Sequence, residues 1–157
     1  MMIQALTEPA IPFTRRPRRT ENWSIHSRSV DKSNPPGILI ADADPSIRTL
    51  AALKRRGFHV WLAADGEDAL EIYGLYQHAI NLVLLSVHMP RLDGPETAKV
   101  LRDFDPNVVC GFMGERFADY SVEDLESLTP LPFFEKPIEN IEMLWLIACD
   151  HQVELAN

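Results

Sequence analysis

The stretch that decides the fold is residues 80–85, INLVLL, near the middle of the chain. A short, almost wholly apolar run of this kind is typical of a strand buried on both faces, as in a parallel sheet. Four more short apolar runs predict further strands, at residues 38–41, 58–63, 108–113 and 131–135.

Segments with helical periodicity separate these runs. In the first, Ile47, Leu50 and Ala51 recur at the spacing of one helical face. Asp44, which precedes a proline, is interpreted as the N-cap of this helix, and Gly57 as its end.

Three of the later helices are predicted to begin at Asp65, Ser121 and Ile138. A further helix is predicted at about residues 96–103. Strands and helices therefore alternate five times. This order predicts an α/β fold, with a parallel sheet covered by helices on both faces. In such sheets, ligands collect at the carboxyl ends of the strands.

Composition divides the chain into two parts. Residues 1–36 contain five prolines, six Lys or Arg and three acids, and we expect a disordered basic arm. Residues 37–157 carry nine bases and twenty acids, and we expect one domain. The net charge of -8 argues against nucleic-acid or anionic-membrane binding by the whole chain. The RRPRR cluster at residues 15–19 could still contact nucleic acid or an anionic surface, or could simply be solvated.

No apolar run is long enough to cross a membrane, and the N-terminus lacks the apolar region of a secretory signal. The two cysteines, Cys110 and Cys149, form neither a disulfide framework nor a zinc pattern. We therefore expect a cytoplasmic protein.

Four segments together resemble a response regulator receiver domain. They are residues 38–48 (ILIADADPSIR), 64–70 (ADGEDAL), 82–94 (LVLLSVHMPRLDG) and 134–137 (FEKP). They occur in the family's order and spacing, and the resemblance covers about residues 37–150. It implies a flavodoxin-like, doubly wound (βα)5 three-layer sandwich with a five-stranded parallel sheet in the order 2-1-3-4-5.

The family transfers a phosphoryl group from a histidine kinase to an aspartate at the end of the third strand. The resemblance puts this phosphoacceptor at Ser86, and the two metal-binding acids at Asp42 and Ala43. It puts a fourth-strand hydroxyl residue at Gly114 and a fifth-strand lysine at Lys136. Three of the five positions therefore depart from the family pattern, and the member is degenerate.

These departures change the expected chemistry. An acyl phosphate requires a carboxylate nucleophile, which Ser86 lacks. Asp42 is the one remaining candidate metal ligand, so we expect weak or absent Mg²⁺ binding and no cofactor. Asp42 could instead bind loop amides or pair with Lys136. Ser86 could be a small neutral filler, and Asp44, in the same acidic pocket, could be only a helix cap.

The switch positions of the family map to Gly114, Phe133, Lys136 and Pro137. Phe133 could belong to a locked switch surface or could simply pack at the sheet edge. The resemblance also implies a cis bond between Lys136 and Pro137.

The expected function is that of a stand-alone, non-enzymatic module in two-component phosphorelay signalling, which acts on a protein partner in trans without phosphorylation. The partner face is predicted at about residues 121–149. Phe133, Phe134 and Trp145 are its candidate anchors, although Trp145 also fits the core stripe of the last helix. The alternatives are a fold reused to bind a small ligand, or modification at a non-standard residue. The turn at residues 42–45 has no glycine, which disfavours a phosphate cradle and a nucleotide-binding enzyme.

Overall fold

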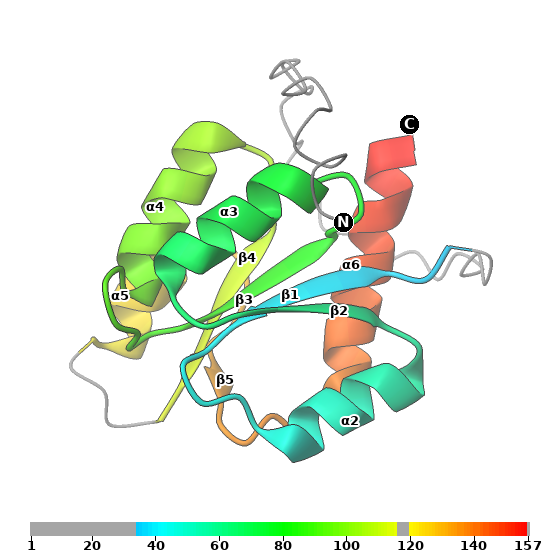
Figure 1. Cartoon of the computed structure of the whole chain (residues 1–157), viewed down its shortest axis with the longest axis horizontal. Coiled ribbons are helices and arrows are strands. Elements are labelled where there is room, and N and C mark those ends of the chain that lie inside the picture. Colours follow the sequence, from blue (N-terminus) through cyan, green and yellow to red (C-terminus); the bar gives the residue numbers. More distant parts are fainter. Residues whose placement is uncertain (1–33, 116–119, 157) are drawn as a thin grey trace.

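Strands and helices alternate along the chain as predicted (Figure 1). The computed structural model describes residues 34–115 and 120–156, with side chains described as far as residue 150. The strands are β1 (Gly37–Ala41), β2 (His59–Ala63), β3 (Leu82–Ser86), β4 (Cys110–Gly114) and β5 (Phe134–Glu135). The helices are α2 (Ile47–Arg56), α3 (Gly66–Tyr76), α4 (Gly94–Phe104), α5 (Val122–Ser127) and α6 (Ile141–Ala156).

The five strands form one parallel sheet in the order β2-β1-β3-β4-β5, which confirms the predicted flavodoxin-like topology. β1 pairs with both β2 and β3. The strand that follows β1 in the sequence therefore lies on one side of it, and the later strands lie on the other side. The loops after β1 and β3 therefore diverge, and this is where doubly wound folds place their sites.

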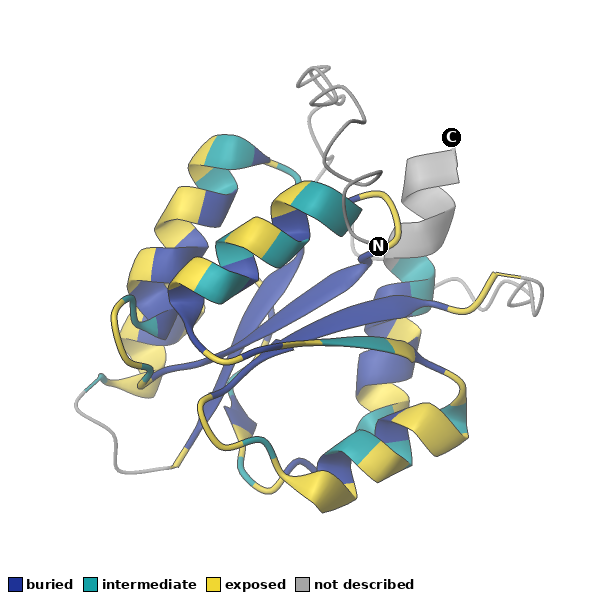
Figure 2. Ribbon diagram, viewed as in Figure 1, coloured by how far each residue is buried: buried dark blue, intermediate teal, exposed yellow. Residues whose placement is uncertain are grey.

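Alternate residues of each central strand face opposite helical layers. Ile38 and Leu82 pack in a cluster with residues of α2 and α6, whereas Leu39 and Val83 pack with residues of α3, α4 and α5. Every residue of β1, β3 and β4 is buried, and Figure 2 shows these strands between the two helical layers. This burial on both faces explains why the runs are apolar throughout.

The first helix differs from the prediction in its cap and in its buried face. Ser46 is the N-cap, and its side chain accepts the backbone N–H of Thr49, so the assignment of Asp44 as the cap is wrong. The buried residues are Thr49 and Leu53, whereas Ile47 is 83% exposed. At about 100° per residue, Ile47 lies on the side of the helix opposite to Thr49 and Leu53. The ten residues of α2 include four bases, three of them in the last turn, and no acid.

The other helix starts follow local chemistry. Asp65 caps α3 and Ser121 caps α5, as predicted. Asp93 caps α4 in a capping box with Glu96, so this helix begins earlier than expected. The last helix begins at Ile141 rather than Ile138, and β5 contains only two residues.

The predicted arm lies outside the described residues except for residues 34–36, and so does its cluster at residues 15–19. Within the described ranges, none of the helices combines the length and the apolar character needed to span a bilayer.

The domain begins at a tightly packed glycine. The N–H of Gly37 donates to Asn81 Oδ1 at 2.7 Å, and a Cβ at Gly37 would lie 1.8 Å from the carbonyl oxygen of Ala79. Gly74, in contrast, lies exposed in α3, with no atom within 4 Å of an added Cβ.

These two glycines give a matched test of the packing. We expect Gly74→Ala to raise the free energy of unfolding by about 0.5–1 kcal/mol, because alanine favours the helix. Gly37→Ala should lower it by about 1–3 kcal/mol, because the backbone must move. Chemical denaturation of both variants measures the difference. Equal effects of the two substitutions would contradict the packing at Gly37.

Candidate functional site

Four strand ends meet at one edge of the sheet, and each brings a predicted site position there. Asp42 directly follows β1, Ser86 is the last residue of β3, Gly114 ends β4, and Lys136 follows β5. Because parallel strands end at the same edge, residues far apart in the sequence come together.

Lys136 makes the two contacts that organise this edge. Its Nζ donates a hydrogen bond to Ser86 Oγ at 2.8 Å and lies 2.7 Å from Asp42 Oδ2. Asp42 Oδ1 accepts the backbone N–H of Asp44 at 3.0 Å. Both structural roles considered for Asp42, an ion pair with Lys136 and a bond to a loop amide, are therefore present.

The charges of this cluster interact strongly because most of them are shielded from water. Asp42 is 8% exposed and Ser86 is 4% exposed, while the side chain of Lys136 is 31% exposed. One carboxylate and one ammonium group balance each other, and the hydroxyl of Ser86 is neutral. A carboxylate in place of Ser86 would leave one cation facing two anions.

A cleft of about 230 Å³ opens beside this cluster. Asp44 and Glu115 bring exposed carboxylates to its lining, and Pro137 lines it from the β5 side. The Lys136–Pro137 peptide bond is cis, as the resemblance implies. Ala43 is exposed and does not line the cleft.

Phe133 packs against the backbone of Gly114. A Cβ at Gly114 would lie 3.4 Å from Phe133 Cζ and 3.6 Å from Val87 Cγ2, so the aromatic ring occupies space next to this glycine. Phe133 is half-buried and packs at the border of the core cluster that contains Val87. The position of Gly114 therefore supplies no hydroxyl, and the ring closes over it.

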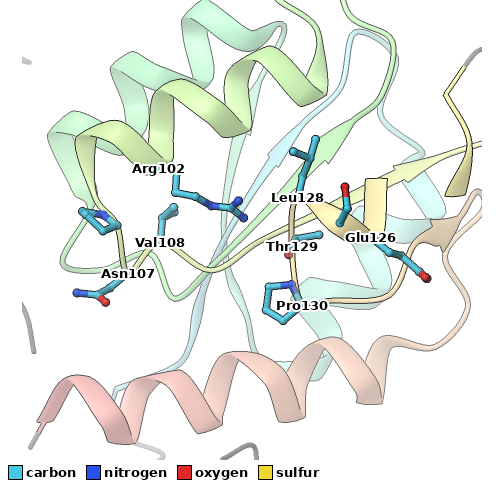
Figure 3. A pocket seen from close by; sticks show the side chains of 9 residues that line it. Arg102, Asn107, Val108, Glu126, Leu128, Thr129 and Pro130 are labelled. Carbon is cyan, nitrogen blue, oxygen red and sulfur yellow. The ribbon is translucent and has the colours of Figure 1, made fainter. Parts of the chain in front are cut away.

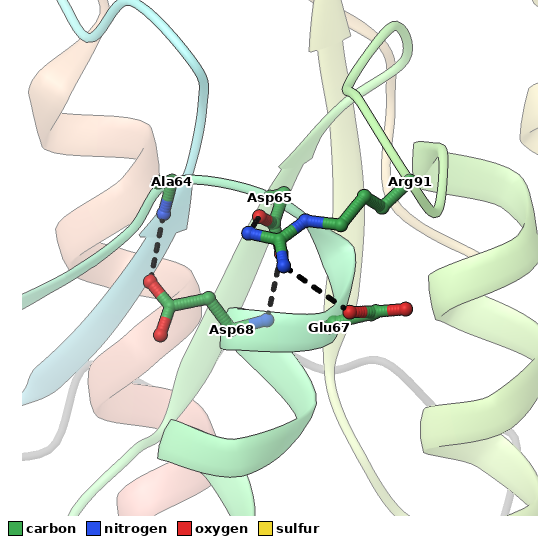
Figure 4. A network of polar contacts seen from close by, with 5 residues as sticks. All are labelled: Ala64, Asp65, Glu67, Asp68 and Arg91. Atoms are coloured by element: carbon green, nitrogen blue, oxygen red, sulfur yellow. Dashed lines mark hydrogen bonds and ion pairs between the residues drawn. The ribbon is translucent and has the colours of Figure 1, made fainter.

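A second polar network ties the loop before α3 to the loop after β3 (Figure 4). The buried carboxylate of Asp65 accepts the backbone N–H of Asp68 at 2.8 Å and forms an ion pair with Arg91. Arg91 also lies 3.5 Å from Glu67, and Asp68 accepts the N–H of Ala64 at 2.9 Å.

The Asp65–Arg91 pair is the contact near the site that sequence reasoning missed. Arg91 has a φ of 68°, an uncommon backbone conformation for a residue other than glycine. The pKa of Asp65 is lowered, chiefly by the hydrogen bond from the backbone N–H of Asp68 and further by Arg91. No local sequence pattern signals a pair between two loops.

Comparison with known proteins identifies the family. The family model described as "Response regulator receiver domain" matches residues 38–148. The chain is 29% identical over 112 residues to the sensor kinase CckA of Brucella abortus, and 45% identical over 71 residues to the probable transcriptional regulator ycf27 of Cyanophora paradoxa. These matches cover 70% and 44% of this chain, but only 12% and 29% of those proteins.

Solved structures agree on the fold. A chain in the CheX–CheY–BeF3–Mg²⁺ complex of Borrelia burgdorferi is 27% identical, with a TM-score of 0.60 over 72% of this chain and 87% of that one. The complex of Saccharomyces cerevisiae Ypd1 with the Ssk1 receiver domain contains a chain that is 18% identical, with the same TM-score over 79% and 93%. The present chain therefore belongs to the response regulator receiver domain family of two-component signalling.

The lowered pKa of Asp65 predicts a pH dependence of stability. A carboxyl whose pKa is lower in the folded state stabilises the fold above its unfolded pKa, and this contribution is lost as pH falls through the folded value. We expect Asp65→Asn, which retains a capping side chain, to be less stable than the wild type at neutral pH. The difference should shrink as the pH falls below about 4.

Thermal unfolding from neutral to acidic pH measures this difference. Asp44→Asn is the control, because Asp44 is an exposed carboxyl in a neighbouring loop, and it should show little pH-dependent change relative to the wild type. If the difference in thermal stability between Asp65→Asn and the wild type stayed constant with pH, the role of the Asp65 charge would be contradicted.

Proposed function

We propose that this chain is a non-enzymatic receiver-fold module that acts by binding a protein partner and does not require phosphorylation of a carboxylate. The observation that carries the proposal is the contact of Lys136 with both Asp42 and Ser86. In this arrangement the cation is already balanced, and the side chain at the phosphoacceptor position is a neutral hydroxyl.

Nucleophile chemistry supports this proposal. Transfer to a carboxylate forms an acyl phosphate, whereas transfer to Ser86 would require removal of a hydroxyl proton by a base. The near neighbour of Ser86 Oγ is the ammonium group of Lys136, which donates a hydrogen bond and is paired with Asp42. A protonated lysine cannot accept that proton.

The same residues fit Mg²⁺ poorly. This ion prefers oxygen ligands in near-octahedral geometry, usually one or two carboxylates with water and phosphate oxygens. Both oxygens of Asp42 already have partners, in Lys136 and the N–H of Asp44, and Ala43 offers no ligand. Among the residues that the structure describes, no group of three His, Cys, Asp or Glu residues could hold a metal ion.

Phe133 supports a fixed rather than a switching surface. Its ring lies against Gly114, a position with no side chain that could displace the ring or respond to a phosphoryl group. We therefore propose that this edge of the sheet presents one arrangement to a partner.

The face at residues 121–149 offers apolar contacts for such a partner. Val122, Met143 and Leu146 are 38%, 39% and 46% exposed, respectively. A groove of about 510 Å³ lies alongside, lined by residues 132–140 and Met143. Two similar solved structures contain receiver-type chains with protein partners, CheX and Ypd1, which is consistent with this mode of action.

The anchors on this face differ from those predicted. Trp145 is only 8% exposed, makes an edge contact with the ring of Phe58 at 5.1 Å and lies beneath the guanidinium of Arg56 at 3.9 Å. Phe134 is buried in the same cluster. Both therefore serve the core, and the half-buried Phe133 is the one predicted aromatic that remains available.

The phosphorylation-independent part of the proposal has a direct test. We expect no gain of a phosphoryl mass after incubation with acetyl phosphate and Mg²⁺, and no beryllofluoride-dependent NMR shifts at residues 86–136. Ser86→Asp alone should also stay unlabelled, because Ala43 and Gly114 still lack a ligand and a hydroxyl. An ordinary receiver domain treated in parallel confirms that the reagents are active.

Intact mass spectrometry distinguishes the outcomes. Labelling of Ser86→Asp at the rate of the ordinary receiver would refute the argument from the other two positions. A stable phosphoryl group on Ser86 itself would favour the alternative, modification at a non-standard residue.

The partner face is tested by charge substitution. We expect Met143→Asp and Leu146→Asp to abolish co-purification of a partner from the native cells, because each buries a charge in an apolar contact. Val100→Asp is the matched control, since Val100 is 44% exposed but lies on α4. If both α6 variants still co-purified the partner, or if Val100→Asp lost it to the same extent, the interface would lie elsewhere.

A further inference from the structure

A second pocket lies at the amino end of β4, the end opposite to the cleft beside Lys136 (Figure 3). Its walls come from the last turn of α4, the loop into β4, the end of α5 and the segment that follows α5. Its volume is about 430 Å³, within the range of roughly 300–1,000 Å³ found for small-molecule sites. It shares no lining residue with the cleft.

Arg102 brings the cationic group of this pocket. Figure 3 shows its side chain reaching from α4 across the pocket toward Leu128 and Thr129. Arg102 is half-buried, and no carboxylate in the described part of the chain lies within ion-pair distance of it. In a chain with a net charge of -8, a guanidinium with no carboxylate partner among the described residues is notable.

The thiol of Cys110 does not compensate the charge of Arg102. Cys110 interacts with Arg102, but burial raises the pKa of the Cys110 thiol, so this group is neutral at physiological pH. Arginine remains protonated in proteins and presents several N–H donors in a planar fork. Donors of this kind match the two oxygens of a carboxylate.

The rest of the pocket combines apolar walls with one free polar group. Pro106, Val108, Leu128 and Pro130 line it, and the two proline rings restrict the backbone on either side. The carboxamide of Asn107 has no hydrogen bond within the described residues. The pocket is therefore largely formed before a ligand arrives, which lowers the entropic cost of binding.

The Thr129 hydroxyl is already used by the fold. It donates to the carbonyl of Cys110 and accepts the N–H of Leu131 at 3.2 Å. Ser127 Oγ likewise donates to the carbonyl of Asp124 at 2.6 Å. The side-chain hydrogen-bond donors open to a ligand are thus those of Arg102 and Asn107.

We propose that this pocket binds a small monocarboxylate, whose carboxylate pairs with Arg102 and whose short apolar tail packs on Val108, Leu128 and Pro130. This binding site borders the partner face at residues 126–130, shares none of the exposed apolar residues assigned to that face, and does not depend on the proposed function.

The surroundings select one negative charge rather than several. Glu126 lines the same pocket, and the carboxyl ends of α4 and α5, which carry partial negative charge, lie beside it. A single carboxylate is balanced by Arg102, whereas the second charge of a phosphate dianion would face these groups without a partner. The apolar walls likewise favour a ligand with a hydrocarbon tail.

The test is an NMR titration of the full chain with three probes: butyrate, its neutral isostere butyramide, and inorganic phosphate. We expect saturable shifts with butyrate at residues 102–108 and 127–130, with a dissociation constant on the order of 1 mM. Butyramide and phosphate should bind at least about tenfold more weakly. Butyramide lacks the negative charge that pairs with Arg102, and phosphate lacks the apolar tail.

Variants assign the charge contact. Arg102→Gln should weaken butyrate binding about tenfold or more, and Arg102→Lys by an intermediate factor, because lysine keeps the charge but loses the fork. Arg55→Gln, on the exposed side of α2, should stay within about twofold of the wild type. The dispersion of the NMR spectrum verifies that each variant is folded. If Arg102→Gln does not fold, the affinity of Arg102→Lys for butyrate provides the test.

Several results would overturn the proposal. They are equal binding of butyramide and butyrate, tighter binding of phosphate, shifts centred on Lys136 instead of Arg102, the absence of saturable shifts, and unchanged affinity in both Arg102 variants.

Discussion

Burial of β3 on both faces is the constraint on which the rest of the structure depends. Val83 and Leu85 pack toward one helical layer while Leu82 and Leu84 pack toward the other, so neither layer is dispensable. Pairing with β1 and β4 on either side fixes the register of the sheet centre. As a result, Ser86 ends up at the edge where the neighbouring strands also stop, and its immediate environment is set by the topology.

At that edge, Lys136 holds together the polar side chains of two neighbouring strand ends. A half-buried lysine needs compensating groups, and Asp42 and Ser86 supply an anion and a hydrogen-bond acceptor. The side-chain nitrogen and oxygen atoms that are fully buried in the described residues all have hydrogen-bond partners. Lys136, Asp42 and Ser86 therefore form a polar cluster whose contacts are satisfied within the chain itself.

Much of the fold follows from the sequence alone because its signals are local. The five apolar runs, the cap at Asp65 and the buried stripe of α6 each occupy a few neighbouring residues. The buried face of α2 is predicted only in part: Leu50 packs against the core as expected, but Ile47 and Ala51 are exposed, and Thr49 and Leu53 are buried instead. Local periodicity does not say which side of a helix meets the sheet when both sides carry apolar residues.

The site was predictable in part for a related reason. The strand ends, and hence the meeting of Asp42, Ser86 and Lys136, follow from topology together with the family resemblance. The ion pair between Asp65 and Arg91 and the pocket around Arg102 join segments distant in sequence, and no motif marks them. Trp145 had two readings on the sequence, and only the packing against Phe58 distinguishes them.

The uneven charge of α2 has a consequence for how the molecule meets others. This helix carries four bases and no acid, whereas α5 carries three acids and no base, in a chain that is acidic as a whole. Positive charge is therefore concentrated on α2 and negative charge on α5. An acidic surface that approaches by diffusion is attracted to α2 and repelled by α5 before any contact forms. Such orientation speeds productive encounters at low ionic strength and fades as salt screens the field.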